Sequence, residues 1–270
     1  MKSNIRIHPY FLTPKLSNHN YPLFVFLPGM DETGKELVYI QTAGLEAAFD
    51  VRCFVIPPNN LTNWDEMTEE VANLTEMELK KYPRRQAVAC GETSAVYLCA
   101  ESFGGCLALK VLEKFPQLFT RIILINSASS FHRVPWLNFG SLLFPHTPEF
   151  FYKISSFLSV PFLVNIKRVS ANGSQAILKS TSSAPRKTAN QRLALMREFN
   201  IDEKKLAQIT QPVLLIASEN DRLLPSKFEA RRLNSIFPNS QMITLPHSGH
   251  ACLVETDINL YQILLSTNFI

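Results

Sequence analysis

The sequence predicts an α/β fold with a mostly parallel central sheet and helices on both of its faces. Short apolar runs bounded by turn residues alternate with stretches whose apolar residues recur at helical spacing, which is typical of buried strands joined by helices. The runs lie at residues 23–27, 51–56, 95–100, 121–125, 213–217 and 242–245, and the helical stretches at 35–48, 65–82, 103–115, 226–236 and 251–266. Strands that alternate with helices pair in parallel through helical crossovers. The 270 residues, 46% of them hydrophobic and 19% charged, fit a single domain.

Local signals place two further features. Residues 1–20 are polar and contain proline, and we expect one edge strand there, at Ile5–His8. In the helix over 65–82, five residues are spaced for one apolar face: Met67, Val71, Leu74, Met77 and Leu79. Asp65 or Thr62 could cap the start of this helix.

The alternation breaks over residues 129–210, which we predict to be a cap of short helices inserted into the domain. This segment is rich in Phe and Leu and contains four prolines among residues 135–161. The core of the domain is then residues 1–128 and 211–270. Residues 131–210 hold eleven Lys or Arg and four Asp or Glu, a local charge of +7; since the chain totals +4, the remainder is −3. The cap is therefore predicted to be the basic part of the molecule.

Composition excludes several classes of function. A net charge of +4 is too mild to indicate nucleic-acid binding. The five cysteines form no C-x-x-C pair and do not stand with histidines at zinc spacing, and no glycine-rich phosphate loop is present, so we predict no metal and no cofactor. An odd number of cysteines favours a reducing compartment, and the first 21 residues lack the apolar core of a signal peptide. No apolar run approaches the ~20 residues that span a bilayer, so we expect a soluble protein.

The stretch from Val96 to Leu109 carries the strongest chemical signal. An apolar strand leads into Ala100-Glu101-Ser102-Phe103-Gly104, and a helix follows. This order matches a nucleophile elbow, G-x-S-x-G, in which a sharp strand-to-helix turn exposes a serine hydroxyl. Alanine replaces the first glycine, and we expect slightly looser packing of strand on helix there. Ser94 lies in a similar pattern, but it precedes a strand, so we interpret it as a loop residue.

A serine nucleophile needs a histidine to take its proton and a carboxylate to orient that histidine. Asp221 follows the strand at 213–217, and His250 follows the strand at 242–245. Parallel sheets place their sites beyond the carboxyl ends of the strands, so both side chains are expected near Ser102. Glu219 is the alternative acid.

His247 is the alternative histidine, but His250 follows Gly249 and directly precedes the predicted last helix. Taken singly, Asp221 is better explained as a turn residue and His250 as a polar helix start. Three such residues after three strands, in the order serine, acid, histidine, indicate a catalytic triad.

Two backbone N–H groups would complete the site as an oxyanion hole. One is that of Phe103, directly after the serine, and the other is that of Met30, in the loop after the strand at 23–27. Gly29 would let this backbone approach closely, although Pro28-Gly29-Met30 is also compatible with a plain tight turn.

The aromatic residues of the cap are candidate substrate contacts. Phe131, Trp136 and Phe139 could roof the serine and form an apolar tunnel for an acyl or isoprenoid chain, although core packing is the usual explanation of such residues. The basic cap could also contact anionic lipid surfaces. We therefore expect a small, lipid-like ester as substrate and peripheral membrane contact as a possible partner interaction.

Several longer stretches carry a family resemblance. They are Leu27-Pro28-Gly29-Met30-Asp31-Glu32-Thr33-Gly34, Phe49-Asp50-Val51-Arg52-Cys53, Glu101-Ser102-Phe103-Gly104-Gly105-Cys106-Leu107-Ala108-Leu109 and Asn126-Ser127-Ala128-Ser129-Ser130-Phe131. Together they resemble the α/β-hydrolase part of the plastid esterase/lipase/thioesterase family, the phytyl-ester-synthase-like proteins of plants and cyanobacteria. The resemblance covers most of residues 22–135 and returns around 212–250. It implies an α/β-hydrolase fold and activity on fatty acyl or phytyl esters, in the cytoplasm or, in a plant, the plastid.

The resemblance also has departures. The family usually has glycine at the positions of Ala100 and Glu32, and Glu32 adds a charge near the predicted oxyanion loop. Long family members carry an acyltransferase-like H-x-x-x-x-D motif, but none of the six histidines here has an aspartate five residues on. We therefore expect an esterase that works through an acyl-enzyme. Acyl transfer to phytol or another lipid alcohol is the first alternative, and a non-catalytic lipid-binding protein on a hydrolase scaffold is the second.

Overall fold

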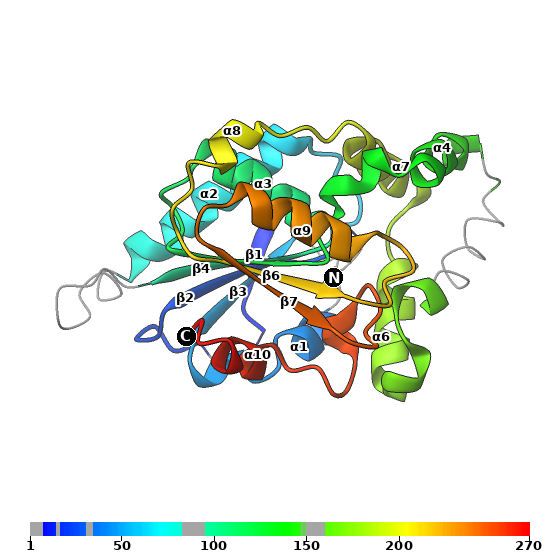
Figure 1. Ribbon diagram of the computed structural model, residues 1–270. Helices are drawn as coiled ribbons and strands as arrows, with labels where there is room; N and C mark the ends of the chain where they lie inside the picture. The colour runs from blue at the N-terminus through cyan, green and yellow to red at the C-terminus, as the bar shows by residue number, and fades with distance from the viewer. Residues whose placement is uncertain (1–7, 15–16, 31–34, 83–94, 147, 149–159) are drawn as a thin grey trace, which may run out of the picture.

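The computed structural model describes residues 8–14, 17–30, 35–82, 95–146, 148 and 160–270. Its centre is a seven-stranded sheet in the order β1-β3-β2-β4-β5-β6-β7 (Figure 1). The strands are β1 Tyr10–Leu12, β2 Leu23–Leu27, β3 Asp50–Val55, β4 Val96–Glu101, β5 Arg121–Ile125, β6 Val213–Ser218 and β7 Ser240–Leu245. Only the pairing of β1 with β3 is antiparallel among them. The predicted α/β fold with a mostly parallel sheet is confirmed.

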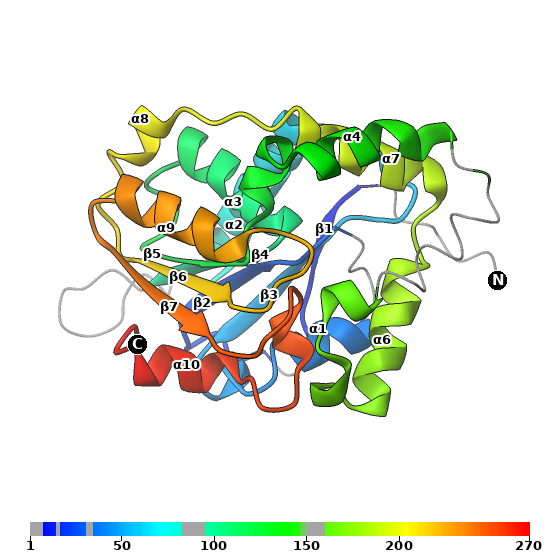
Figure 2. The same cartoon turned by 45° about the vertical axis from the view of Figure 1, so that its right-hand side comes forward.

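Helices cover both faces of the sheet (Figures 1 and 2). One face carries α2 Trp64–Lys81, α3 Phe103–Lys114 and α9 Ser226–Ile236, and the other carries α1 Lys35–Gln41 and α10 Leu260–Ser266. Alternate side chains of a strand point to opposite faces. In β2, Leu23, Val25 and Leu27 pack in the core under α2, α3 and α9, whereas Phe24 and Phe26 pack in the second core with α1 and α10. Burial on both faces explains why this strand is apolar throughout.

The chain between β5 and β6 carries the helices of the predicted cap. They are η3 Ala128–Arg133, α4 Pro135–Leu143, η4 Phe144–His146, η5 Ile166–Arg168, α6 Ala171–Thr181, α7 Arg186–Arg197 and α8 Glu203–Leu206. Figure 2 shows α4 and α7 together at one side, and α6 near α1 at the other. Phe150, Phe151 and Phe157 of this segment lie outside the described residues.

Three local predictions need correction. The edge strand among the described residues is β1, Tyr10–Leu12, whereas residues 5–7 of the strand predicted at Ile5–His8 lie outside the described part. The N-cap of α2 is Asn63, which forms a capping box with Glu66, and not Asp65 or Thr62. The helix over 35–48 is α1 followed by the short η1, Leu45–Ala47, because Gly44 has a positive φ of 86°.

The last helix does not start at residue 251. The chain forms the short η6, Cys252–Val254, and then extends at Glu255, which bridges Val169 of the cap; α10 begins only after its cap Asn259. A tertiary contact has therefore overridden the helical pattern. Among the described helices, none combines the length and the apolar character needed to cross a bilayer.

Candidate active site

Ser102 occupies the sharp turn between β4 and α3. Its backbone has φ 54° and ψ −116°, a conformation that few non-glycine residues adopt. The turn brings the start of α3 against the end of β2, since a Cβ on Gly104 would lie only 2.1 Å from the carbonyl oxygen of Leu27. Glycine is therefore required at position 104, whereas Ala100 fits fully buried in β4. The predicted elbow geometry is present.

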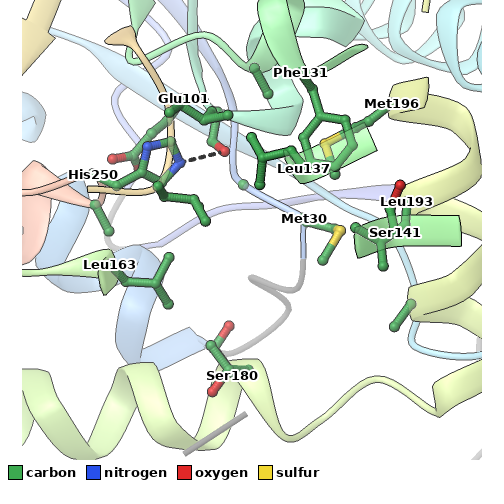
Figure 3. A pocket seen from close by; sticks show the side chains of 18 of the residues that line it. Met30, Glu101, Phe131, Leu137, Ser141, Leu163, Ser180, Leu193, Met196 and His250 are labelled. Atoms are coloured by element: carbon green, nitrogen blue, oxygen red, sulfur yellow. Dashed lines mark hydrogen bonds between the residues drawn. The ribbon is translucent and has the colours of Figure 1, made fainter. Parts of the chain in front are cut away.

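The structure brings Ser102, His250 and Asp221 into one hydrogen-bonded chain. His250 Nε2 lies 2.7 Å from Ser102 Oγ, and His250 Nδ1 lies 2.7 Å from Asp221 Oδ2. The side chains of His250 and Asp221 are 3% and 2% exposed. In Figure 3 the dashed line at the imidazole of His250 marks the bond to Ser102 Oγ. This arrangement allows His250 to accept the serine proton while Asp221 orients the imidazole.

Asp221 is held as a carboxylate. Its Oδ1 accepts the backbone N–H groups of Leu223 and Leu224, both at 2.9 Å, and its Oδ2 accepts the hydroxyl of Ser226 as well as His250. Burial alone would raise the pKa of Asp221, but the charge of His250 and these hydrogen bonds outweigh burial, so the pKa lies below its ordinary value.

The two alternatives for the acid and the histidine lie elsewhere. Glu219 is half exposed and pairs with Lys227 Nζ at 2.6 Å. His247 has a positive φ of 69°, and its carbonyl accepts the side-chain amide of Asn165 over 3.2 Å. The structure therefore places His250, and not His247, beside Ser102.

Both predicted oxyanion donors lie next to the serine in the chain or in space. Phe103 opens α3, and Gly29 and Met30 line the same cavity as Ser102. The carbonyl of Met30 accepts a hydrogen bond from the guanidinium of Arg192, a buried residue of α7. The following residues 31–34, which include Glu32, lie outside the described part.

The cavity in front of Ser102 has a volume of about 430 Å³. Its walls come from the loop after β2, from η3 and α4, and from α6 and α7 (Figure 3). Most of its lining is apolar, with Leu163, Leu193 and Met196 among the contributors. Such a cavity suits an apolar ligand placed by a few polar groups.

Two of the three predicted aromatic contacts reach this cavity. Phe131 and Trp136 line it, but Phe139 does not and is 65% exposed. The reason is helical periodicity: on α4, Leu137 and Ser141 are buried toward the cavity, and Phe139 falls on the opposite, outer face. Phe139 is therefore corrected from a cavity contact to a surface residue.

Comparison with known proteins agrees with this architecture. Residues 73–257, more than half of the chain, match the alpha/beta hydrolase fold family. The chain belongs to the α/β hydrolase family.

Curated relatives of this hydrolase include an ester synthase and a methyl ester esterase. Phytyl ester synthase 1, chloroplastic, of Arabidopsis thaliana is 29% identical over 268 residues, which cover 91% of this chain and 37% of that protein. A pimeloyl-[acyl-carrier protein] methyl ester esterase of Nitrosomonas europaea is 26% identical over 200 residues, 71% of each chain. The hydrolase thus spans little more than a third of the length of phytyl ester synthase 1.

Solved structures show the same fold at low identity. A carboxylesterase structure of Nitrososphaera gargenis has a TM-score of 0.72 at 12% identity, covering 99% of this chain and 96% of that one. A thermophilic esterase of Thermogutta terrifontis has a TM-score of 0.67 at 17% identity, covering 97% and 92%.

The hydrolase site uses polar residues that sequence reasoning did not single out. Asn126 directly follows β5 and has a φ of 45°. Its Oδ1 accepts the N–H of Ser218 over 2.7 Å, and its Nδ2 donates to Ser218 Oγ over 2.9 Å and to the carbonyl of His250. Asparagine tolerates this left-handed conformation, so an Asn directly after a strand was a usable signal. Glu101 is buried at the cavity wall and accepts Gln41 Nε2 over 2.9 Å.

The described cysteines and acids of the hydrolase offer no metal site. Within the described ranges, no group of three or more His, Cys, Asp or Glu is arranged to hold an ion. Cys53, Cys99, Cys106 and Cys252 are buried free thiols, and burial raises the pKa of each one. Cys90 lies outside the described residues.

Proposed function

We propose that this hydrolase is a serine esterase that cleaves lipid-like carboxylic esters through an acyl-enzyme. The observation that carries the proposal is the hydrogen-bonded chain from Ser102 through His250 to Asp221, which opens on an apolar cavity. The named activities of the curated relatives, phytyl ester synthesis and methyl ester cleavage, support an ester as the substrate class.

The proposed chemistry follows from the geometry. Ser102 Oγ attacks the ester carbonyl while His250 Nε2 takes its proton, and the backbone N–H groups of Phe103 and Met30 stabilise the oxyanion. The tetrahedral intermediate expels the alcohol, which takes the proton from His250, and leaves an acyl ester on Ser102. Water then attacks this ester, with His250 as base, and releases the carboxylic acid and the free serine.

Replacement of the nucleophile tests the proposal. Ser102→Ala should abolish turnover of p-nitrophenyl esters and leave the circular dichroism spectrum unchanged. Ser235→Ala, at an exposed hydroxyl on α9, is the matched control and should keep wild-type rates. Turnover by Ser102→Ala at the wild-type rate would overturn the assignment.

Acyl transfer is the second candidate, favoured by the similarity to phytyl ester synthase 1. An apolar cavity could admit a lipid alcohol in place of water, and the alcohol oxygen would then take the acyl group from Ser102. A labelled acyl donor supplied with and without phytol separates the reactions. Labelled phytyl ester would support transfer, and free fatty acid alone in both cases would reject it.

A non-catalytic lipid-binding protein would be a different class of function. Binding needs neither the strained turn at Ser102 nor the bond to His250, so their presence supports catalysis. A fluorophosphonate probe should therefore label Ser102 in the folded protein. Lipid binding without labelling would favour the binding protein.

The substrate class is tested at the cavity wall. Leu193 lines the cavity from α7, and Leu193→Trp should fill part of it (Figure 3). We expect this variant to hydrolyse long-chain p-nitrophenyl esters more slowly and p-nitrophenyl acetate at the wild-type rate. Equal effects on both esters would argue against acyl binding in this cavity.

Peripheral membrane contact is proposed for the cap. The nine residues of α4 carry no charge, and Trp136, Phe139, Leu142 and Leu143 are more than half exposed on it. Such a helix in a segment of local charge +7 suits an anionic lipid surface. Phe139→Ser should weaken sedimentation with anionic vesicles, whereas Phe228→Ser, at an exposed phenylalanine on α9, should not.

A reducing compartment, the cytoplasm, remains our prediction for the location, in keeping with the four buried free thiols.

A further inference from the structure

The cap is hydrogen-bonded to the loop that carries His250. We call residues 246–251 the histidine loop and residues 163–169 the cap segment. Ala251 donates its backbone N–H to the carbonyl of Leu163 over 2.8 Å, and Asn165 Nδ2 donates to the carbonyl of His247 over 3.2 Å. The cap segment therefore holds the histidine loop on both sides of His250.

The two segments touch backbone to backbone. A Cβ on Gly249 would lie 2.8 Å from Val164 Cα and 3.0 Å from the backbone nitrogen of Asn165. Distances below 3 Å require the neighbouring backbone to move. Gly249, the residue before His250, is thus pressed directly against the cap segment.

Glu255 joins these two backbones through one carboxylate. Its Oε1 accepts the N–H of Gly249 over 2.8 Å and the N–H of Asn165 over 3.3 Å. The Glu255 side chain is completely buried, so the charge needs a partner inside the protein.

Arg168 of the cap segment supplies this partner. Its Nη1 lies 3.1 Å from Glu255 Oε2 and also donates to the carbonyl of Pro246 over 3.4 Å and to Ser248 Oγ over 3.2 Å. Asp257 binds the outer side of the guanidinium and is largely exposed. Arg168 therefore contacts the histidine loop at Pro246 and Ser248. It also neutralises Glu255, whose carboxylate binds the loop at Gly249.

We propose that Arg168 and Glu255 are positioning residues, through which the cap keeps His250 aligned with both Ser102 and Asp221. This inference rests on the proposed esterase function and adds a role for the cap beyond forming the cavity. Neither residue lines the cavity, so both act through the histidine loop. Alignment matters because a misplacement of about 1 Å at a catalytic group can cost roughly a hundredfold in rate.

Four variants of the full chain test the pair: Arg168→Met, Glu255→Gln, the double variant, and the control Asp257→Asn, which leaves the Arg168–Glu255 contact in place. We expect Arg168→Met and Glu255→Gln to lower kcat about tenfold or more, with KM changed less than threefold, because the loop shifts and the cavity does not. Asp257→Asn should stay within twofold of wild type. The double variant leaves no unpaired buried charge, so it replaces Arg168→Met in the test if that single variant does not fold.

Rates are taken below the melting temperature of each variant and divided by the serines that a fluorophosphonate labels to completion. This division separates misalignment from loss of folded protein. If kcat per labelled serine equals that of wild type in Glu255→Gln and in the double variant, the pair is only structural and the proposal is overturned.

Hydrogen exchange of the histidine loop provides a readout that does not depend on the reaction. The amides of residues 247–251 should exchange faster in Arg168→Met or the double variant than in Asp257→Asn, and equal exchange would overturn the proposal. If wild-type protein neither reacts with the probe nor hydrolyses esters, the proposed function fails, and the exchange experiment still decides whether the pair holds the loop.

Discussion

Asn126 donates a side-chain N–H to the backbone carbonyl of His250 over 2.6 Å. The same amide group binds Ser218 at the end of β6, so one buried side chain joins the ends of β5 and β6 to the histidine loop. His250 is thus held from the sheet side by Asn126 and from the cap side by residues 163–169.

Replacement of Asn126 should therefore affect both stability and rate. Asn126→Ala leaves the N–H of Ser218 and the carbonyl of His250 without this partner, and we expect a loss of about 1–3 kcal/mol in the free energy of unfolding. We also expect a lower kcat in urea-free buffer. The control is Ser218→Ala, which removes only the bond between Asn126 Nδ2 and Ser218 Oγ. It should lower the free energy of unfolding and kcat by less than Asn126→Ala does. Unchanged kcat in folded Asn126→Ala would contradict the role of Asn126 in placing His250.

Arg192 offers a test of the oxyanion loop. Its buried guanidinium donates to the carbonyls of Met30 and Ile56, which follow β2 and β3. Arg192→Met should release the loop that carries the Met30 N–H and lower kcat about tenfold, less than the ~10²–10³ lost with an oxyanion donor itself.

Two further variants give this experiment its controls. Arg197→Met removes an arginine of the same helix that binds the α4 backbone at Ser141 over 3.1 Å, and it should alter KM more than kcat. Arg192→Lys keeps the positive charge but loses the planar guanidinium that donates to two carbonyls. We therefore expect a kcat between those of wild type and Arg192→Met. If Arg192→Met and Arg197→Met behave alike, Arg192 has no special connection to the oxyanion loop.

We expect the two small residues of the elbow, Gly104 and Ala100, to differ in how well they tolerate substitution. Gly104→Ala would place a Cβ 2.1 Å from Leu27 O and 2.6 Å from Pro28 O, so we expect little folded protein, measured as soluble yield and circular dichroism. Ala100→Gly meets no such clash and should cost about 0.5–1 kcal/mol, because glycine loses more backbone freedom on folding. A stable, active Gly104→Ala would show that β2 and α3 are not in the close contact described.

The depressed pKa of Asp221 has a consequence for acid stability. A carboxylate whose pKa is lower in the folded state stabilises the fold above its ordinary pKa of 3.8, and this contribution disappears as the pH falls through the folded value. Wild type should therefore lose free energy of unfolding below pH 4 more steeply than Asp221→Asn, which cannot titrate. Urea unfolding of both proteins between pH 6 and pH 2.5 measures the difference, and parallel curves would mean that Asp221 is not stabilised as a carboxylate.

The sequence predicted the features that depend on short-range patterns. The strand over 121–125 and the helix over 226–236 have the predicted bounds, because apolar runs and helical spacing are local signals. Ser102, Asp221 and His250 could be selected because each follows a strand of a parallel sheet, and the carboxyl ends of such strands meet at one edge.

The features that were missed depend on contacts between distant segments. Glu255 interrupts the predicted last helix because it binds the cap, and Arg192 reaches Met30 across 162 positions of the chain. No periodicity encodes such pairs. Phe139 was misplaced for a simpler reason: composition showed an aromatic cap, but the phase of α4, which turns Phe139 outward, follows only from where the helix packs.

The bonds between residues 163–169 and 246–257 also constrain how this fold can be recombined. A chimera that takes a foreign cap, with both junctions outside 129–210, would pair the native Glu255 with whatever residue replaces Arg168. Such an exchange would keep the sheet intact, but the buried carboxylate of Glu255 would lack its arginine partner next to the loop that carries His250. A cap of this type should therefore be exchangeable between relatives only when residues 246–257 are exchanged together with it. The two segments are far apart in the sequence but have to be replaced as a pair.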